Sequence, residues 1–141
     1  MKRVVLDTCV IVSAFRSQFG ASYEIMQRVA NGHIRPLVTT ALFLEYESVL
    51  LRPEQMAVHN LDFSDIREAL FDLATFCEPV ELFYRWRPQL GDPQDELVLD
   101  AAINGRADAL ITHNVRDFMK AGDKFGLTVI RPGNFLKGTM Q

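Results

Sequence analysis

The sequence has little of several features that would place a protein in a special class. Its two cysteines, Cys9 and Cys77, have neither the spacing of a metal site nor the number of a disulfide framework, so we interpret both as reduced packing residues. The longest apolar runs are too short to cross a bilayer, and the first residues lack the apolar segment and cleavage site of a signal peptide. We therefore expect no membrane partner and a cytoplasmic location.

The chain also lacks an excess of basic residues. Fifteen Lys and Arg against eighteen Asp and Glu leave a net charge of −3, so the composition does not by itself indicate nucleic-acid binding. Clustered carboxylates can nevertheless bind divalent cations that reverse the local field, and a weakly acidic protein can then act on a polyanion. The length of 141 residues and the 48% hydrophobic content predict one globular domain over residues 1–141.

Short apolar segments alternate with helical patterns along the chain. Strands are predicted at residues 3–7, 36–39, 80–82, 108–112 and 127–130. Helices are predicted at residues 9–19, 21–31, 41–51 (capped by Thr39 or Thr40 and stopped by Pro53), 65–76 (capped by Ser64) and from residue 93 onward. This alternation is typical of an α/β fold. We expect a three-layer α/β/α sandwich with a mostly parallel sheet of four to five strands.

Residues 91–102 are the most informative stretch, because four carboxylates fall within nine residues at a Gly-Pro turn. Asp92 has the position of a helix N-cap. At about 100° per residue, Asp95 lies in the middle of the apolar face, so its carboxylate should point inward and needs a metal ion, an arginine or a cap as partner. A separate polar stripe, which we expect to be solvated, consists of Glu96, Asp100 and Asn104.

Other carboxylates fall where predicted strands end or helices begin. Asp7 ends the first strand and Asp117 follows the fourth, while Glu45 or Glu47 could join from a helix, because periodicity does not decide between them. Parallel strands would bring these ends to one edge of the sheet, where crowded carboxylates need cations or acquire raised pKa values. Oxygen ligands suit Mg²⁺ or Mn²⁺ rather than zinc.

Metal-assisted phosphodiester hydrolysis is the chemistry that such a cluster supports. Thr8, Thr112 and Asn114 could position a water or hydrogen-bond the metal ligands, and His113 is either a phosphate contact or incidental. Residues 83–88 interleave aromatic and basic side chains, which suits single-stranded nucleic acid but is also typical of a surface loop with a half-buried Trp. Substrate preference should depend on loops 16–20 and 83–92.

In their order and spacing, these motifs resemble the PIN-domain ribonucleases, in the VapC-like branch of toxin components of toxin–antitoxin systems. The resemblance runs nearly end to end. It is carried by Val-Val-Leu-Asp-Thr at 4–8 with Val10 and Ser13, Leu-Glu-Tyr-Glu-Ser-Val-Leu at 44–50 with Arg52-Pro53, Asp-Pro-Gln-Asp at 92–95 with Ala101, Ala-Asp-Ala-Leu-Ile-Thr-His-Asn at 107–114 with Asp117-Phe118, and Arg-Pro-Gly-Asn-Phe-Leu at 131–136.

The resemblance implies a Mg²⁺- or Mn²⁺-dependent endoribonuclease that cleaves single-stranded RNA, forms a homodimer and is inhibited by a cognate antitoxin protein. The second acidic position of the family falls on Glu45, which leaves Glu47 solvated. The implied catalytic set is Asp7, Glu45, Asp95 and Asp117, with Asp7, Asp95 and Asp117 as metal ligands and Thr8, Asp92, Thr112 and Asn114 in support.

Two positions depart from the family pattern and bear on the number of bound metals. Cys9 stands where the family usually has Asn, and Asn114 stands where many members have Asp. One alternative is a catalytically weak or inactive PIN-fold module that acts through protein or RNA binding. Another is a phosphohydrolase with an aspartyl nucleophile; this would place a second Asp two residues after Asp7, where Cys9 stands.

Overall fold

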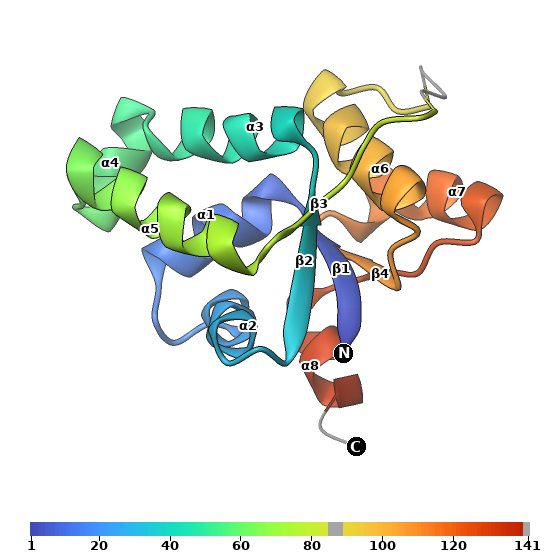
Figure 1. The fold of residues 1–141 in the computed structure, drawn as a ribbon, viewed down its shortest axis with the longest axis horizontal. Helices are drawn as coiled ribbons and strands as arrows, with labels where there is room; N and C mark the ends of the chain where they lie inside the picture. The colour runs from blue at the N-terminus through green and yellow to red at the C-terminus, as the bar shows by residue number, and fades with distance from the viewer. Residues whose placement is uncertain (85–88, 140–141) are drawn as a thin grey trace.

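The computed structural model describes residues 1–84 and 89–139, and it contains a five-stranded sheet (Figure 1). The strand order is β3-β2-β1-β4-β5, and every neighbouring pair is parallel. The strands are β1 (Lys2–Leu6), β2 (Ile34–Val38), β3 (Glu78–Pro79), β4 (Ala109–Ile111) and β5 (Val129–Ile130). The predicted α/β sandwich with a parallel sheet is confirmed. The segment Arg85–Pro88, for which stacking on nucleic acid was considered, lies outside the described residues.

Helices cover both sides of this sheet. Within the described residues they are α1 (Thr8–Arg16), α2 (Ala21–Ala30), α3 (Thr40–Leu50), α4 (Pro53–His59), α5 (Phe63–Phe76), α6 (Pro93–Gly105), α7 (Val115–Phe125) and α8 (Pro132–Thr139). Helices α6 and α7 lie on one side of the strands and α1, α2 and α5 on the other (Figure 1). Helix α3 contacts both α1 and α6, so it joins the two layers beyond the carboxyl ends of the strands.

The central strand β1 explains why this arrangement forms. Val4, Val5 and Leu6 have almost no exposed surface, because helices cover both faces of the sheet. An uninterrupted apolar run of this kind is typical of a buried parallel strand. Strand β1 pairs with β2 on one side and with β4 on the other, and it therefore delivers the following residue, Asp7, to the middle of the sheet's carboxyl edge.

Two glycines allow the helices of one layer to lie close to the sheet. A Cβ atom on Gly105 in α6 would lie 2.9 Å from Leu37 Cδ1 and 3.0 Å from Val80 Cγ2. A Cβ atom on Gly122 in α7 would lie 2.8 Å from Val129 Cγ2. A side chain at Gly105 would require the Leu37 and Val80 side chains to shift, and one at Gly122 would also crowd the carbonyl oxygen of Leu127 at 3.0 Å, so glycine suits this close packing.

Several element boundaries differ from those expected. Pro53 was expected to stop α3, but it is also the first residue of α4, because its fixed φ and missing N–H suit the first turn of a helix. Helix α5 starts before Ser64, with Asp62 as the N-cap in a reciprocal capping box with Asp65. Helices α7 and α8 were not predicted. The strand expected at residues 80–82 lies slightly earlier in the chain, at Glu78–Pro79 (β3).

Other local predictions are confirmed. Thr39 caps α3, and its Oγ1 accepts a hydrogen bond from the Leu42 N–H at 3.1 Å. Both cysteines are free thiols. In the part of the chain that the structure describes, no helix combines the length and the apolar character needed to cross a bilayer.

Candidate functional site

Asp7 lies at the end of β1 and is the most firmly held carboxylate of the carboxyl edge. Its side chain is buried, and Oδ2 accepts a hydrogen bond from Thr112 Oγ1 at 2.7 Å. Thr112 Oγ1 in turn accepts a hydrogen bond from the Asn114 N–H at 2.9 Å. This chain of hydrogen bonds ties the carboxylate to the residues that follow β4, so Thr112 orients Asp7.

Cys9 lies beside the same carboxylate and is more than a packing residue. Its Sγ donates to Asp7 Oδ2 at 3.3 Å and accepts from the His113 N–H at 3.5 Å. Burial, aided by the negative charge of Asp7, raises the pKa of the Cys9 thiol to about 12. The thiol therefore stays protonated at neutral pH and acts as a weak donor where the resemblance expects an Asn.

The start of α6 places two more carboxylates near Asp7. Asp92 is the N-cap, as predicted, and its Oδ1 accepts from the Gln94 N–H at 2.8 Å. Asp95 follows in the first turn. Its pKa is raised to about 6, chiefly by burial and then by the negative charges of Asp7, Asp92 and Asp117. Four carboxylates from three separate segments thus act on one another at this edge.

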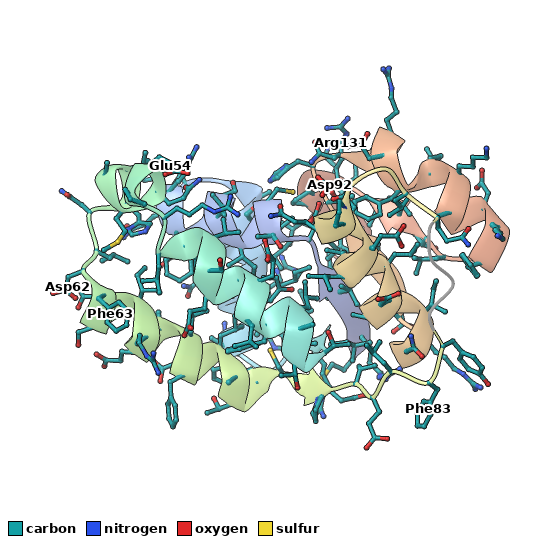
Figure 2. All side chains as sticks on the ribbon, turned by 90° about the horizontal axis from the view of Figure 1, so that it is seen from above. Glu54, Asp62, Phe63, Phe83, Asp92 and Arg131 are labelled. Atoms are coloured by element: carbon teal, nitrogen blue, oxygen red, sulfur yellow. The ribbon has the colours of Figure 1, made fainter. Side chains whose placement is uncertain are left out.

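A cleft of about 460 Å³ opens at this edge of the sheet. Figure 2 labels Asp92 at the start of α6, which lines the cleft, and Glu54 in α4, whose neighbours Arg52 and Gln55 also line it. The cleft combines the carboxylates of Asp7, Asp92 and Asp95 with the guanidinium groups of Arg16 and Arg52. The remaining lining residues are Thr8, Cys9, Val12, Ser13, Val49, Gln55, Gln94, His113 and Asn114. The predicted aspartates and their neighbours therefore share one polar cleft.

Two residues of the predicted catalytic set do not line this cleft. Glu45 in α3 is largely buried, and its Oε1 lies 4.0 Å from Nη2 of Arg52, which lines the cleft. Asp117 is exposed in the first turn of α7. Within residues 1–84 and 89–139, neither Glu45 Oε1 nor Thr8 Oγ1 has a hydrogen-bond partner. Among these same residues no three His, Cys, Asp or Glu side chains lie close enough together to hold a metal ion.

Arg16 and Arg52 were given no role by sequence reasoning, although Arg52 belongs to a quoted motif and Arg16 to a loop expected to influence specificity. Arg16 is in the last turn of α1, and Arg52 is the N-cap residue of α4. A helix at residues 53–59 was not predicted, so the position of Arg52 and Gln55 in the same cleft as Asp7 was missed. The available signal was the Arg52-Pro53 pair, because proline is common in the first turn of a helix.

The polar stripe of α6 is not solvated, contrary to expectation. Glu96 is buried, and its Oε1 accepts from the N–H groups of Gln89 and Leu90, both at 2.7 Å. Asn104 Oδ1 accepts from the N–H groups of Phe83 and Tyr84, both at 2.8 Å. Asp100, between them on the stripe, is also buried. The stripe binds backbone groups of a passing segment, which covers the helix face that periodicity assigned to solvent.

We expect Asn104→Ala to loosen this segment without unfolding the protein. The substitution leaves the N–H groups of Phe83 and Tyr84 without their acceptor, and both residues are exposed to solvent. Hydrogen exchange at these two amides should accelerate by about tenfold, since one hydrogen bond contributes roughly 1 kcal/mol. Mass spectrometry or NMR would measure it, with the amides of β1 as the internal control; unchanged rates at residues 83 and 84 would contradict the role of Asn104.

The raised pKa of Asp95 predicts a pH dependence of stability. The folded protein holds the Asp95 proton more tightly than the unfolded chain, so the free energy of unfolding should fall as pH rises from about 4 to 6. Because Asp95 is half-buried and water screens part of the effect, we expect a fall of about 1–2 kcal/mol. Urea unfolding in EDTA across this range measures it. The Asp95→Asn variant should lack this fall in stability. The same pH profile in the variant and in the wild type would refute the role of Asp95.

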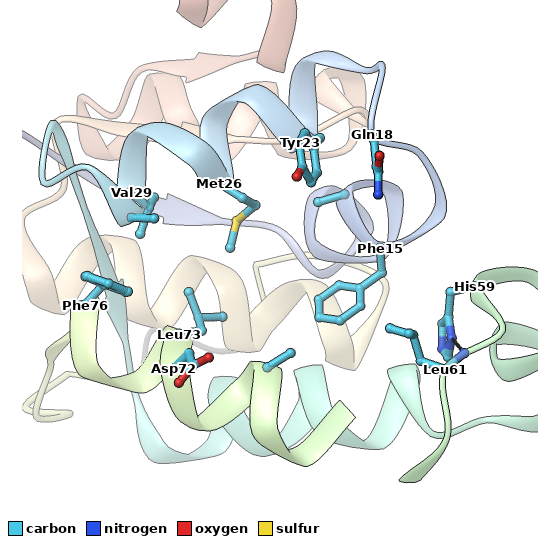
Figure 3. A pocket seen from close by; sticks show the side chains of 13 residues that line it. Phe15, Gln18, Tyr23, Met26, Val29, His59, Leu61, Asp72, Leu73 and Phe76 are labelled. Atoms are coloured by element: carbon cyan, nitrogen blue, oxygen red, sulfur yellow. Dashed lines mark hydrogen bonds between the residues drawn. The ribbon is translucent and has the colours of Figure 1, made fainter. Parts of the chain in front are cut away.

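A second cavity, of about 380 Å³, lies between α1, α2 and α5 (Figure 3). Phe15, Met26, Leu73 and Phe76 give it an apolar wall. Among the described residues that line this cavity, Asp72 is the single carboxylate.

The fold and the cleft define an α/β protein whose carboxylates gather at the carboxyl edge of a parallel sheet. A profile of the PIN domain family matches residues 3–116, which is most of the chain. The chain therefore belongs to the PIN domain family, and the resemblance seen in the sequence is confirmed.

Comparison with solved structures agrees with this assignment. One match is a chain from the crystal structure of VapBC2 from Rickettsia felis bound to a DNA fragment from their promoter. It is 13% identical, with a TM-score of 0.59, and the alignment covers 92% of this chain and 98% of that chain. At this identity the likeness shows a shared fold. No curated protein gives a significant match.

Proposed function

We propose that this protein is a Mg²⁺- or Mn²⁺-dependent endoribonuclease that hydrolyses phosphodiester bonds of single-stranded RNA. The observation that carries the proposal is that Asp7, Asp92 and Asp95 line one cleft, where the repulsion of Asp95 by the charges of Asp7, Asp92 and Asp117 adds to burial in raising the pKa of Asp95. A bound divalent cation would relieve this repulsion. Membership of the PIN domain family and the motif resemblance to its ribonucleases support the reaction.

The donor atoms fit such a cation, because they are carboxylate and hydroxyl oxygens. We propose Asp7, Asp95 and Asp117 as its ligands, with Glu45 completing the catalytic set; the buried Glu45 Oε1 has no hydrogen-bond partner within the described residues. Mg²⁺ or Mn²⁺ in such a site supplies an activated water and neutralises negative charge on the phosphate.

The residues around the carboxylates would keep them in place. Thr112 and Cys9 donate hydrogen bonds to Asp7 Oδ2, which fix the orientation of its carboxylate. Asp92 caps α6 and so holds Asp95 in the first turn of that helix. We propose Thr8 and Asn114, which line the cleft beside Asp7, as further contacts to ligands or water.

We propose further that the nuclease is the toxin of a toxin–antitoxin pair, with a homodimeric assembly and a cognate antitoxin protein as partner. The support is the motif resemblance to VapC-like toxins together with the fold that this chain shares with a VapBC2 chain. Copurification with the product of a neighbouring gene, and the mass of the resulting complex, would test the partner.

The reaction is tested by incubating a mixed set of single-stranded RNAs with the protein in Mn²⁺, in Mg²⁺ and in EDTA. We expect cutting with either metal and none in EDTA. We also expect Mn²⁺ to raise the melting temperature, because a ligand that binds only the folded state stabilises it. A protein that cuts equally well in EDTA would exclude the metal-dependent mechanism.

Two observations favour a second candidate function, that of a PIN-fold module with weak or no catalysis. Glu45 is placed against Arg52 rather than in the cleft, and the Cys9 thiol stands where an amide side chain is expected beside Asp7. Such a module would bind RNA or a protein without cutting. The absence of both cleavage and a Mn²⁺-induced shift in melting temperature would favour this function over the nuclease.

A further inference from the structure

Arg16 and Arg52 line the same cleft as the carboxylates, and we propose that they bind RNA phosphates that flank the bond to be cut. The inference rests on the function proposed above and names substrate-binding residues for it. Arg16 extends from the last turn of α1, and Arg52 from the residue that precedes α4. Both line the same cleft as Asp7 and Asp95.

Arg16 is held in position but keeps donors for a ligand. Its Nε donates to Gln55 Oε1 at 3.1 Å, and Gln55 is in the first turn of α4 and also lines the cleft. Within the described residues, Arg16 makes this one hydrogen bond. Its two terminal NH₂ groups therefore remain available as donors. A guanidinium fixed through Nε presents these groups as a fork, which matches two oxygens of one phosphate.

Arg52 is positioned more loosely. Its Nη2 lies 4.0 Å from Glu45 Oε1, which is too long for a hydrogen bond, and its side chain is 42% exposed. The Glu45 carboxylate attracts the guanidinium without occupying its donors, which remain available for a phosphate in the cleft that Arg52 lines. Arg52 can therefore turn to a phosphate while Glu45 keeps its charge nearby.

Electrostatics explains why an RNA-cutting site needs such a pair. The whole chain carries a net charge of −3, and three aspartates line the cleft. These groups alone would repel a polyanion. The two guanidinium groups that line the same cleft supply positive charge that would offset this repulsion and attract a phosphate backbone.

The test separates binding from cleavage by using Asp7→Asn as the background, so that the RNA stays intact. A fluorescein-labelled single-stranded RNA is titrated with this protein, and with versions that also carry Arg16→Ala or Arg52→Ala, at several KCl concentrations and a fixed Mg²⁺ concentration. Each alanine should weaken binding about tenfold. Each should also lower the slope of log affinity against log salt by about 0.7, the value for one lost phosphate contact on a single strand.

Arg67→Ala is the matched control, because it removes the same charge elsewhere. Arg67 pairs with Glu47 at 3.9 Å and lies over the Phe63 ring in α5, and it does not line the cleft. The RNA affinity and the salt slope of the Arg67→Ala variant should equal those of the Asp7→Asn background. If Arg16→Ala and Arg52→Ala behave like Arg67→Ala, the proposed phosphate contacts are wrong.

Lysine variants show whether a loss of affinity in the alanine variants comes from the lost contact or from a folding defect. Arg16→Lys and Arg52→Lys keep the charge but lose the fork, so they should retain the salt slope and recover only part of the affinity. Equal affinity of the lysine and alanine variants would overturn the role of charge. With Asp7 restored, the alanine variants should raise KM more than they lower kcat.

The outcomes also separate this proposal from the function on which it rests. Arginine-dependent binding by a protein that cuts no RNA would overturn the nuclease and keep the phosphate contacts. Metal-dependent cutting with unchanged KM in the Arg16→Ala and Arg52→Ala variants would keep the nuclease and overturn the contacts.

Discussion

Replacing Asp95 with asparagine is expected to abolish RNA cleavage and, in the absence of metal, to stabilise the protein. The side chain is half-buried among the charges of Asp7, Asp92 and Asp117, and its raised pKa shows that the carboxylate is unfavourable there without a cation. An amide removes the repulsion together with one proposed metal ligand. Cleavage should fall by roughly a thousandfold or more.

Two measurements on the same variant show whether both effects have this single cause. In EDTA at pH 7, Asp95→Asn should gain about 1–2 kcal/mol in the free energy of unfolding after allowance for solvent screening. In Mn²⁺ the gain should shrink or reverse, because the metal stabilises the wild type more strongly than the variant. Clusters of functional carboxylates typically lower the free energy of unfolding of the protein that carries them.

Asp123→Asn provides the matched control for this substitution. Asp123 is exposed in the last turns of α7 and does not line the cleft, so the same chemical change there should leave cleavage and metal response unchanged. Asp7→Asn should also lose cleavage, but without the gain in stability, because its carboxylate already accepts hydrogen bonds from Thr112 and Cys9. Cutting that persists in both Asp7→Asn and Asp95→Asn would point to a contaminating nuclease and reject the assigned residues.

Patterns that depend on neighbouring residues in the chain predicted the structure well. The apolar runs identified a parallel sheet because such strands are buried on both faces. The Asp-Pro pair located the start of α6, and the helical period placed Asp95 on its apolar side, where the structure has it lining the cleft. Each of these features follows from local geometry, so a single sequence is sufficient to show it.

Features that depend on contacts between distant segments could not be predicted in this way. Glu96 and Asn104 have the spacing of a solvated stripe, but residues 83, 84, 89 and 90 cross that face and hydrogen-bond to it. The cleft position of Arg52 depends on how α4 packs, and its approach to Glu45 depends on the path of α3. Periodicity describes one helix or strand at a time. The cleft is lined by residues of α1, α3, α4 and α6 and by residues that directly follow β1 and β4.

Tyr46 is expected to be one of the most costly residues to truncate outside the cleft. Its side chain is 1% exposed, and its hydroxyl donates a hydrogen bond to the carbonyl of Leu6. Tyr46→Ala would leave a large cavity and remove this bond, at a cost of about 3–5 kcal/mol. Since small domains are stable by only about 5–15 kcal/mol, this variant should lose a large part of its stability.

Tyr46→Phe isolates the hydrogen bond from the packing. It keeps the ring but leaves a buried carbonyl without this donor, so we expect a loss of about 1–2 kcal/mol. Urea unfolding should show a lower midpoint with an unchanged slope. Tyr23→Phe removes a hydroxyl that makes no hydrogen bond to the described residues, and it should leave the midpoint unchanged. A Tyr46→Phe midpoint equal to that of the wild type would mean that the bond adds no net stability.

The position of this hydrogen bond links stability to the proposed site. Leu6 directly precedes Asp7, and Tyr46 directly follows Glu45, so the bond ties the end of β1 to the helix that carries the second acidic residue. Tyr46→Phe should therefore lower kcat at temperatures where the variant is still fully folded. Full activity under those conditions would show that Asp7 is positioned by Thr112 and Cys9 alone, without help from α3.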